Sequence, residues 1–569
     1  MDPTGETFKA TISKALVTKI NIAIVIFLLV TCVAVVGLRP VSMFNTNVAS
    51  LVECALRDCH SKKVRWTEGR SPRNMTREKM ATANEKTPSF LRALRGDAVI
   101  GLVNMADDDA IEWGIVAKTA VVEFERVSEN IKWSDLFPEW IDEEEVFEGM
   151  SCPEIPMPGF AAYEEMDVVV VKLPCRIPDV GWNRDVFRLQ VHLVAANLAV
   201  KRGKRDWRGT AKLAFLSKCE PMRELFRCDD IAGREGEWSM YEAQVERLEE
   251  KLRLPLGSCM LAMPLWGEGI NEEFNVSSKF SAPPSPSGDP RREAYVTVLH
   301  SKENYVCGAI MLAHRLRKTG SDRDLVLLHD KSIGPQKLQA LADAGWALRE
   351  IERIRSPHAK RGAYNEYNYS KLRIWQLSDH YDKVVFVDSD VLVLRNLDHL
   401  FRLPQMSATG NSRAIFNSGV MVIEPSNCTF EALMLRREDV VSYNGGDQGF
   451  LNEMFAWWHW LPRRVNFLKI LRGNTTEERR MKDRLYVTEP ATLYGLHYLG
   501  IKPWRCYRDY DCNWNVDDQR RFASDAAHAV WWRRHDEMGE GMRRMCGLTA
   551  ERKQQLENVG LILNIGTTK

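Results

Sequence analysis

The spacing of apolar residues changes several times along the chain and divides it into segments. Residues 20–38 (INIAIVIFLLVTCVAVVGL) form an apolar run without a charged side chain. A helix of that length rises about 1.5 Å per residue, which nearly covers the hydrocarbon layer of a bilayer. Lys9, Lys14 and Lys19 precede the run and favour a cytosolic tail at residues 1–19. We therefore expect a single-pass signal anchor over 20–38, and a cleaved signal peptide is the alternative.

Beyond the anchor, the pattern predicts a stem and then a folded domain. Polar and basic residues dominate 39–90, which is typical of a flexible stem. Residues 91–280 combine apolar runs with helical spacing, so we expect an α/β domain there, and no motif assigns it a role. The expected strands are VIGLVN and MDVVVVKLPC, and the expected helices are FRLQVHLVAANLAVKRG and MYEAQVERLEEKLRL.

A proline-rich segment separates this domain from a second one. Residues 281–292 (SAPPSPSGDPRR) can continue neither a helix nor a central strand, so they read as a linker. Short apolar strands then alternate with helices, which predicts a mostly parallel sheet over 293–545, followed by a tail at 546–569. The expected strands are AYVTVLH, DLVLLHD and KVVFVD, and the expected helices are NYVCGAIMLAHRLRKT, QKLQALADAGW and KLRIWQL. Ligands of such sheets bind at the carboxyl ends of the strands.

Charge and cysteine content bear on the class of binding partner and on the cellular compartment. The 78 Lys and Arg residues balance 77 Asp and Glu residues, so no net field favours a nucleic-acid partner. Thirteen cysteines are present, and one of them, Cys32, lies in the expected anchor. The acceptor pattern for N-glycosylation occurs at Asn74, Asn275, Asn368, Asn427 and Asn474. Both features suit a lumenal domain in an oxidising compartment, although the cysteine pairing cannot be read from the sequence.

One Asp-X-Asp motif stands at the end of a predicted strand. Asp388-Ser389-Asp390 closes the apolar run Val384–Val387, so both carboxylates emerge at the carboxyl end of a buried strand. Two such carboxylates can share one hard divalent cation and leave positions for diphosphate oxygens. Three other acidic groups read as solvated loops instead: Asp107-Asp108-Asp109, Asp322-Arg323-Asp324 and Asp509-Tyr510-Asp511.

Three further motifs follow downstream. His497 offers a neutral imidazole as a third metal ligand, and Lys502 can meet diphosphate oxygens. Gly500 between them would let the backbone approach the phosphates closely. Asn417-Ser418-Gly419 and the segment 444–448 (NGGDQ) each read as a tight turn when taken alone.

Along the chain, the Asp-X-Asp motif is followed by Asn417-Ser418-Gly419, then by 444–448, and then by the segment from His497 to Lys502. Four motifs in that order resemble glycosyltransferase family 8, which includes glycogenin. The strand AYVTVLH and the phrase Tyr369-Ser370-Lys371-Leu372 fit the same family, and the resemblance covers about residues 294–504. Within the family, the chain looks closest to the plant glycogenin-like branch, whose members transfer glucuronic acid onto xylan. The resemblance implies an α/β GT-A nucleotide-diphospho-sugar transferase fold, preceded by the anchor and an additional α/β domain.

The resemblance also implies residue roles. Asp388, Asp390 and His497 would be the ligands of Mn²⁺, and Lys371, Asp447 and Gln448 are the catalytic candidates. The residues expected to contact the UDP-sugar are Asp388, Ser389, Asp390, Asn417, Ser418, Gly419, Asn444, Gly445, Gly446, Asp447, Gln448, His497, Tyr498, Leu499, Gly500, Ile501 and Lys502.

Two departures from glycogenin limit the comparison. Asn444 stands where glycogenin has an aspartate, and the spacing from His497 to Lys502 is one residue shorter. No acceptor tyrosine can be identified, so self-glucosylation is not expected. A glucuronate donor needs a partner for its carboxylate, and Arg373, Lys371 and Asn444 are the candidates.

The resemblance therefore implies a retaining, Mn²⁺-dependent glucuronosyltransferase. We expect it in the Golgi membrane as a single-pass type II protein with a lumenal catalytic domain, in complexes with other Golgi glycosyltransferases. A covalent intermediate on Asp447 or Gln448 and a same-face transfer without one both remain open.

Three alternatives are a glycogenin-like enzyme using UDP-glucose, a non-catalytic scaffold and a haloacid dehalogenase phosphatase. VVFVDSDV fits the phosphatase motif, but it does not lie on the domain's first strand. Leu451 also stands where that family has an aspartate.

Overall fold

The computed structural model describes the two α/β regions of the chain. The described residues are 66–67, 87–105, 117–136, 153–176, 182–252, 291–300, 303–412, 414–473 and 475–557. The predicted cytosolic tail (1–19), the anchor and most of the stem therefore lie outside the described residues, as do the linker up to residue 290 and residues 558–569 of the C-terminal tail. Within the described part, no helix combines the length and the apolar character needed to span a bilayer. All of the described residues belong to one compact unit, 64–569.

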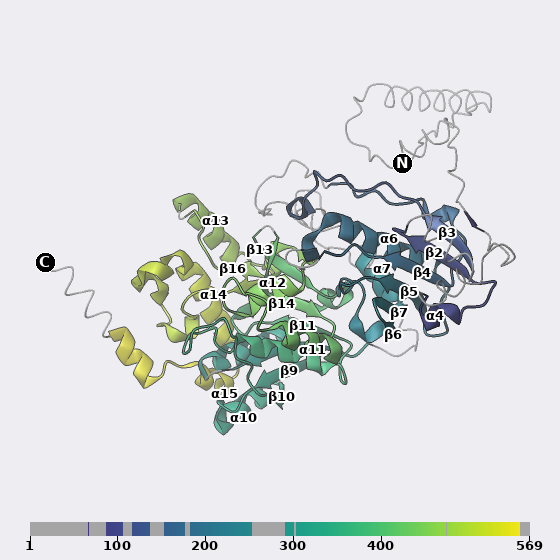
Figure 1. Cartoon of the computed structure of the whole chain (residues 1–569). Helices are drawn as coiled ribbons and strands as arrows, with labels where there is room; N and C mark the ends of the chain where they lie inside the picture. Colours follow the sequence, from purple (N-terminus) through teal and green to yellow (C-terminus); the bar gives the residue numbers. More distant parts are fainter. Residues whose placement is uncertain are drawn as a thin grey trace, which may run out of the picture. The chain divides into compact units, whose positions relative to one another are not determined.

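The N-terminal α/β region is built on a seven-stranded sheet of order β1-β3-β2-β4-β5-β7-β6. Its strands are β1 (Trp66–Thr67), β2 (Val99–Val103), β3 (Lys118–Val122), β4 (Val168–Lys172), β5 (Thr210–Leu216), β6 (Ile231–Glu235) and β7 (Trp238–Gln244). Its helices are α4 (Ser89–Arg92), α6 (Val186–Arg202) and α7 (Val245–Leu252). Strands β3, β2, β4 and β5 are parallel, and β7 runs antiparallel to β5 and β6. Helix α6 lies against the sheet beside α7 (Figure 1).

One predicted helix of this region is half strand. The strands VIGLVN and MDVVVV and the long helix α6 are confirmed. In MYEAQVERLEEKLRL, however, the first five residues belong to β7, and α7 starts only at Val245. Seven ladder positions pair β7 with β5, so the sheet contacts override the helical spacing of these five residues.

The second region holds the expected mostly parallel sheet, of order β10-β9-β8-β11-β14-β13-β15. The strands are β8 (Glu293–Leu299), β9 (Asp324–His329), β10 (Ala347–Glu350), β11 (Lys383–Val387), β13 (Ser407–Ser412), β14 (Ile415–Ile423) and β15 (His459–Leu461). Strands β10, β9, β8 and β11 are parallel, whereas β14 is antiparallel to β11 and β13. A small sheet, β12-β17-β16, contains β12 (Val391–Val393), β16 (Phe467–Leu468) and β17 (Gly495–His497).

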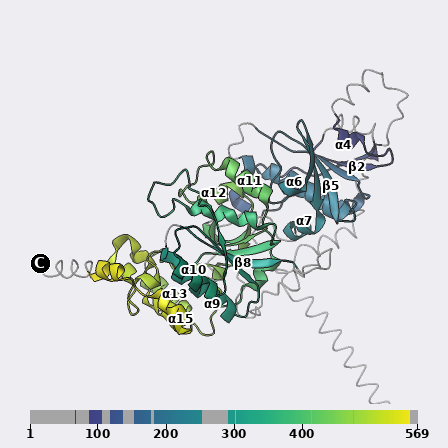
Figure 2. The ribbon, with the colours of Figure 1, turned by 90° about the horizontal axis from the view of Figure 1, so that it is seen from below.

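Helices cover both faces of this sheet. Along β11, Val385 and Val387 pack into a core shared with α9 (Val306–Lys318) and α10 (Pro335–Asp343). Val384 and Phe386 face the opposite core, where α11 and α12 lie. Figure 2 shows these two layers on either side of β8. The remaining helical bounds are α11 (Asn427–Arg436), α12 (Asp447–Met454), α13 (Thr476–Val487), α14 (Asp525–Asp536) and α15 (Glu540–Arg543). The predicted helix KLRIWQL is of the tighter 3₁₀ type, η7 (Asn368–Leu377).

The two regions are joined by a common core and a buried polar network. One hydrophobic cluster contains Leu189 of α6 together with Phe386 of β11. A disulfide links Cys228 of the N-terminal region to Cys428 of α11. We therefore regard the N-terminal region as packed directly onto the second domain rather than tethered to it.

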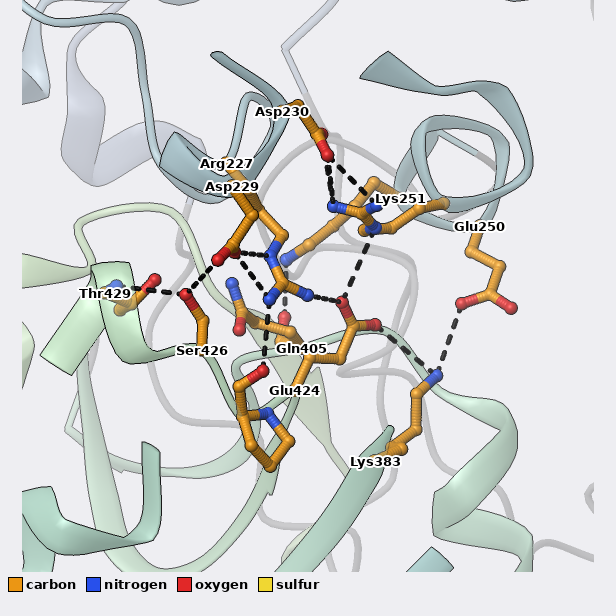
Figure 3. A network of polar contacts seen from close by, with 12 residues as sticks. Arg227, Asp229, Asp230, Glu250, Lys251, Lys383, Gln405, Glu424, Ser426 and Thr429 are labelled. Atoms are coloured by element: carbon orange, nitrogen blue, oxygen red, sulfur yellow. Dashed lines mark hydrogen bonds and ion pairs between the residues drawn. The ribbon is translucent and has the colours of Figure 1, made fainter. Parts of the chain in front are cut away.

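The polar network lies at the same junction (Figure 3). Glu424 accepts from Arg227 Nη1 at 3.1 Å, and its other oxygen lies 3.6 Å from Lys383 Nζ. Lys383 also reaches Glu250 of α7 at 3.3 Å. Burial alone would raise the pKa of Glu424, but Lys383 and Arg227 outweigh it and lower that pKa to about 2. The network is thus held by charged, ionised groups.

Candidate active site

Two strand pairings bring the predicted metal ligands together. Strand β11 ends directly before Asp388, whose backbone N–H donates to Gly419 O of β14 at 2.8 Å. In the small sheet, Val391 of β12 lies opposite His497 of β17, so Asp390 lies next to the histidine. The imidazole Nε2 of His497 is 3.3 Å from Asp390 Oδ1.

The three side chains fit a divalent metal ion. One ligand atom each from Asp388, Asp390 and His497 lies within 4.8 Å of the others, which makes this the candidate metal cluster among the described residues. Ligands on opposite sides of a small divalent ion, each at about 2.1 Å, are about 4.2 Å apart. Two carboxylate oxygens and an imidazole nitrogen suit such an ion. The Asp388 side chain is 30% exposed, which leaves this side of the cluster open.

A relay of amides orients the histidine. The backbone N–H of Gly419 donates to Asn417 Oδ1 at 2.9 Å, so Asn417 must present its oxygen here. Asn466 Nδ2 donates to the same oxygen at 2.8 Å, which turns Asn466 Oδ1 toward His497 Nδ1 at 3.0 Å. His497 Nδ1 must therefore carry the proton, and Nε2 presents its lone pair to the carboxylates. Asn466 was not predicted, because an asparagine before a two-residue strand carries no sequence signal.

Gly419 has a steric role in the same place. A Cβ atom on this residue would lie 2.5 Å from His497 Cε1 and 2.8 Å from Asn417 Oδ1. Any side chain would therefore push the imidazole away from the carboxylates. Asn417 and Gly419, which were expected to line the sugar pocket, therefore also hold the metal ligand His497 in place.

Lys371 lies between the metal ligand Asp388 and the catalytic candidate Asp447. Its Nζ is 2.7 Å from Asp447 Oδ2, 3.4 Å from Asp388 Oδ1 and 3.2 Å from Ser418 O. Burial would lower the pKa of Lys371, but Asp388 and Asp447 outweigh it and raise that pKa. Burial likewise opposes ionisation of Asp447, yet Lys371 lowers the pKa of this carboxyl group. Both groups are therefore charged at neutral pH.

Residues 444–446 form a turn that leads into α12, whose first two residues are Asp447 and Gln448. Asn444 Oδ1 accepts hydrogen bonds from the backbone N–H groups of Gly446 and Gly449, at 3.0 and 3.2 Å. Gly445 has a φ of +67°, which favours glycine. Gln448 Oε1 accepts from the Ser418 N–H at 3.2 Å. The turn expected here is confirmed for residues 444–446, beside β14. The turn expected at Asn417-Ser418-Gly419 is wrong, because these residues lie inside strand β14, which pairs with β11 and β13.

The segment after His497 places Lys502 against the same cluster. Lys502 Nζ lies 2.6 Å from Asp390 Oδ2 and 2.6 Å from Tyr498 O, so its shorter spacing does not prevent its reach. Tyr498 points its hydroxyl to Ala527 O, away from the metal ligands. Gly500 has a φ of +75°, and a Cβ there would meet Asn513 Oδ1 at 2.4 Å. Its glycine is thus required by the backbone conformation and by Asn513.

Two sequence profiles cover most of the chain. Residues 72–259 match the profile described as GUX1-5 N-terminal domain, and residues 296–507 match glycosyl transferase family 8. UDP-glucuronate:xylan alpha-glucuronosyltransferase 2 of Arabidopsis thaliana is 52% identical over 96% of this chain and 92% of its own length. The chain belongs to glycosyltransferase family 8.

Another relative and a solved structure are also similar to this family 8 chain. UDP-glucuronate:xylan alpha-glucuronosyltransferase 1 of the same plant is 46% identical, over 80% of this chain and 68% of its own length. The solved structure of the galactosyltransferase LgtC with donor and acceptor sugar analogues is 19% identical, over 41% of this chain and 95% of that chain. The TM-score of that comparison is 0.29.

Family membership decides between the classes of protein considered from the sequence. A family 8 chain is a glycosyltransferase, so the phosphatase and scaffold alternatives are wrong.

Among the other acidic groups, 107–109 lies outside the described residues, while Asp322 and Asp324 are exposed as expected. The expectation of a solvated loop is wrong for Asp511, which is buried and pairs with Lys469 at 2.7 Å. A lysine far along the chain supplies its countercharge.

Two other predicted positions have partners that restrict their roles. Arg373 donates to Glu352 O and Gln376 Oε1, and neither belongs to the cluster around the metal ligands. Asn368, in a predicted glycosylation pattern, donates to Asp447 Oδ1 at 3.3 Å. Its amide is therefore engaged inside the candidate site.

Proposed function

We propose that this family 8 glycosyltransferase uses Mn²⁺ to transfer glucuronic acid from UDP-glucuronate to xylan, with retention of anomeric configuration. The observation that carries the proposal is the convergence of Asp388, Asp390 and His497 beside Lys502. The donor and acceptor follow the printed name of the relative that is 52% identical over 96% of this chain.

The charged groups of the site suit the departure of a nucleoside diphosphate. Asp388, Asp390 and His497 would hold the metal, which would neutralise charge on the diphosphate when bound. Negative charge grows on the leaving phosphate oxygen as the bond from the sugar C1 breaks. Lys502, which contacts Asp390, supplies a fixed positive charge at this place.

The contacts of Asp447 favour a same-face transfer over a covalent intermediate on this residue. One carboxylate oxygen accepts from Lys371 at 2.7 Å and Ser418 Oγ at 2.8 Å, and the other accepts from Asn368. A carboxylate held by three donors is a poor nucleophile, but it positions Lys371 well. In this route the bond between C1 and the diphosphate breaks, the acceptor hydroxyl oxygen bonds to C1 on the same face, and the hydroxyl proton passes to the departing phosphate oxygen.

A glucuronate donor carries a carboxylate that needs a polar partner. Lys371 is charged and lies within the site, and Asn444 lies on the adjoining turn. Arg373 bonds elsewhere, so we favour the first two for this role. UDP-glucose, which lacks that carboxylate, remains the competing donor.

We also propose a Golgi location with residues 20–38 as a signal anchor and the catalytic domain in the lumen. Four disulfides in the described part of the chain support an oxidising compartment. Lumenal exposure would be checked by protease protection of intact Golgi vesicles, where digestion of the catalytic domain without detergent would contradict it. Complexes with other Golgi glycosyltransferases belong to the same proposal.

Transfer of labelled sugar to xylan oligosaccharides, with and without Mn²⁺, tests the function. We expect transfer from UDP-glucuronate that needs the metal and is lost on chelation. The Asp388→Ala variant should lose transfer by orders of magnitude while it remains folded. Preference for UDP-glucose, or metal-independent transfer, would reject the donor or the metal assignment, respectively.

A further inference from the structure

Two tyrosine rings stand in solvent at the edge of the candidate site. The residue Tyr364 is 86% exposed, and Tyr443 is 54% exposed. Large aromatic side chains normally bury most of their surface, and exposed ones close together mark binding surfaces.

The two rings belong to segments that are bonded to each other. Asn365 follows Tyr364 in the chain, and Asn444 follows Tyr443. The side-chain Nδ2 of Asn365 donates to the backbone oxygen of Asn444 at 2.8 Å. Ser356 Oγ donates to Gly445 O, also at 2.8 Å. Burial raises the pKa of Tyr443, the hydrogen bond with Gln448 opposes that shift, and the nearby charge of Asp447 adds to it. The two tyrosines therefore stand on adjoining, bonded segments, and we refer to them together as the tyrosine surface.

Gln448 lies between this surface and the metal side. Its Oε1 accepts from the Ser418 N–H at 3.2 Å, and Ser418 precedes the glycine that contacts Asp388. Its Nε2 donates to the Tyr443 hydroxyl. A donor whose diphosphate lies at Asp388 and Asp390 therefore has Gln448 beside it and the tyrosine surface beyond. Because the acceptor must approach C1 from outside the donor pocket, this surface is on its route.

We propose that Tyr364 and Tyr443 form the acceptor platform, on which sugar rings of a neutral polysaccharide chain stack. Aromatic side chains combine an apolar face with a polar hydroxyl, which matches the C–H faces and hydroxyl groups of a sugar. The amides of Asn365 and Asn368 border the same surface. This inference rests on the proposed function, since it specifies how that site takes its polysaccharide acceptor.

Binding of xylohexaose to the full-length, detergent-solubilised protein tests the platform, measured by calorimetry with UDP and Mn²⁺ present. We expect Tyr364→Ala to weaken this binding about tenfold and to raise the acceptor KM similarly. Tyr364→Trp should restore both, because it keeps a flat ring. Tyr443→Phe should also retain the stacking, and comparison with Tyr443→Ala separates the ring from its hydroxyl.

Trp207 provides the matched control, since it is 92% exposed but lies in the N-terminal region between α6 and β5. Trp207→Ala should leave acceptor binding and transfer unchanged. Xylohexaose binding within twofold of wild type for both Tyr364→Ala and Tyr443→Ala would overturn the platform. Absent binding by the wild type would overturn it as well. If wild type binds xylohexaose but transfers no glucuronic acid to it, the proposed function fails and the platform stands.

Discussion

Replacing Asn466 by leucine removes the acceptor that fixes the ring orientation of His497. Asn466 is fully buried, and its Oδ1 accepts from His497 Nδ1 at 3.0 Å. Without that oxygen, the buried Nδ1–H has no partner, so the proton can move to Nε2 or the ring can turn. Either change takes the lone pair of Nε2 away from Asp390, which lies 3.3 Å from it.

The expected loss of Mn²⁺ affinity follows from this hydrogen bond between Asn466 and His497. Partners of metal-ligating histidines typically contribute 10- to 100-fold to metal affinity, or about 1.4 to 2.7 kcal/mol. We expect Asn466→Leu to raise the Kd for Mn²⁺ by this factor. Electron paramagnetic resonance of free Mn²⁺ in a titration with UDP present measures it without relying on activity.

A second buried asparagine provides the control. Asn452 bonds to the backbone of Phe416 and Gln448 but to no metal ligand. Asn452→Leu should lower stability while its Kd for Mn²⁺ stays within twofold of wild type. A Kd for Asn466→Leu within twofold of wild type, in a protein that remains folded, would refute the reasoning about the relay.

Three further predictions concern the site and the domain junction. Gly419→Ala should lose Mn²⁺ affinity and transfer, because the new Cβ would lie 2.5 Å from His497 Cε1; an unchanged Mn²⁺ titration would contradict this. Lys502→Met should lower kcat by about 100-fold or more and leave the fold intact, because a fixed charge at the leaving diphosphate is lost; steady-state kinetics with an unchanged kcat would remove Lys502 from this role. Glu424→Gln should lower the unfolding free energy by about 3 kcal/mol, since it leaves Arg227 and Lys383 partly uncompensated, whereas the exposed Asp517→Asn should change little. The pKa of Glu424 is about 2 in the fold against 4.5 when unfolded, so its contribution is complete above pH 4.5 and is lost as pH falls toward 2. Acid unfolding curves of wild type and Glu424→Gln should therefore converge at low pH, and parallel curves would contradict the assignment.

The sequence predicted those features that local pattern encodes. The apolar run before Asp388 and the alternation of strands and helices were sufficient to locate β11 and the parallel half of the sheet. The position of His497 beside Asp390 depends on a pairing between two three-residue strands, and only the ordered motifs of the family indicated it.

What remained hidden depends on tertiary contacts. Asn466 donates to Asn417 Oδ1 and accepts from His497 Nδ1, which belong to two other segments, and a single residue of this type has no sequence pattern. Asp511 looked solvated because its partner, Lys469, is distant in sequence. The first residues of MYEAQVERLEEKLRL have helical spacing, yet pairing with β5 makes them a strand.

The most direct measurement of the central claim is pulsed electron paramagnetic resonance of Mn²⁺ bound to the protein with UDP. The account predicts one Mn²⁺ coupled both to an imidazole nitrogen and to the phosphorus of UDP. The nitrogen coupling should disappear in His497→Ala. A nitrogen coupling that persists in this variant, or a wild-type spectrum without coupling to nitrogen and phosphorus, would contradict a single ion held by Asp388, Asp390 and His497 against the diphosphate.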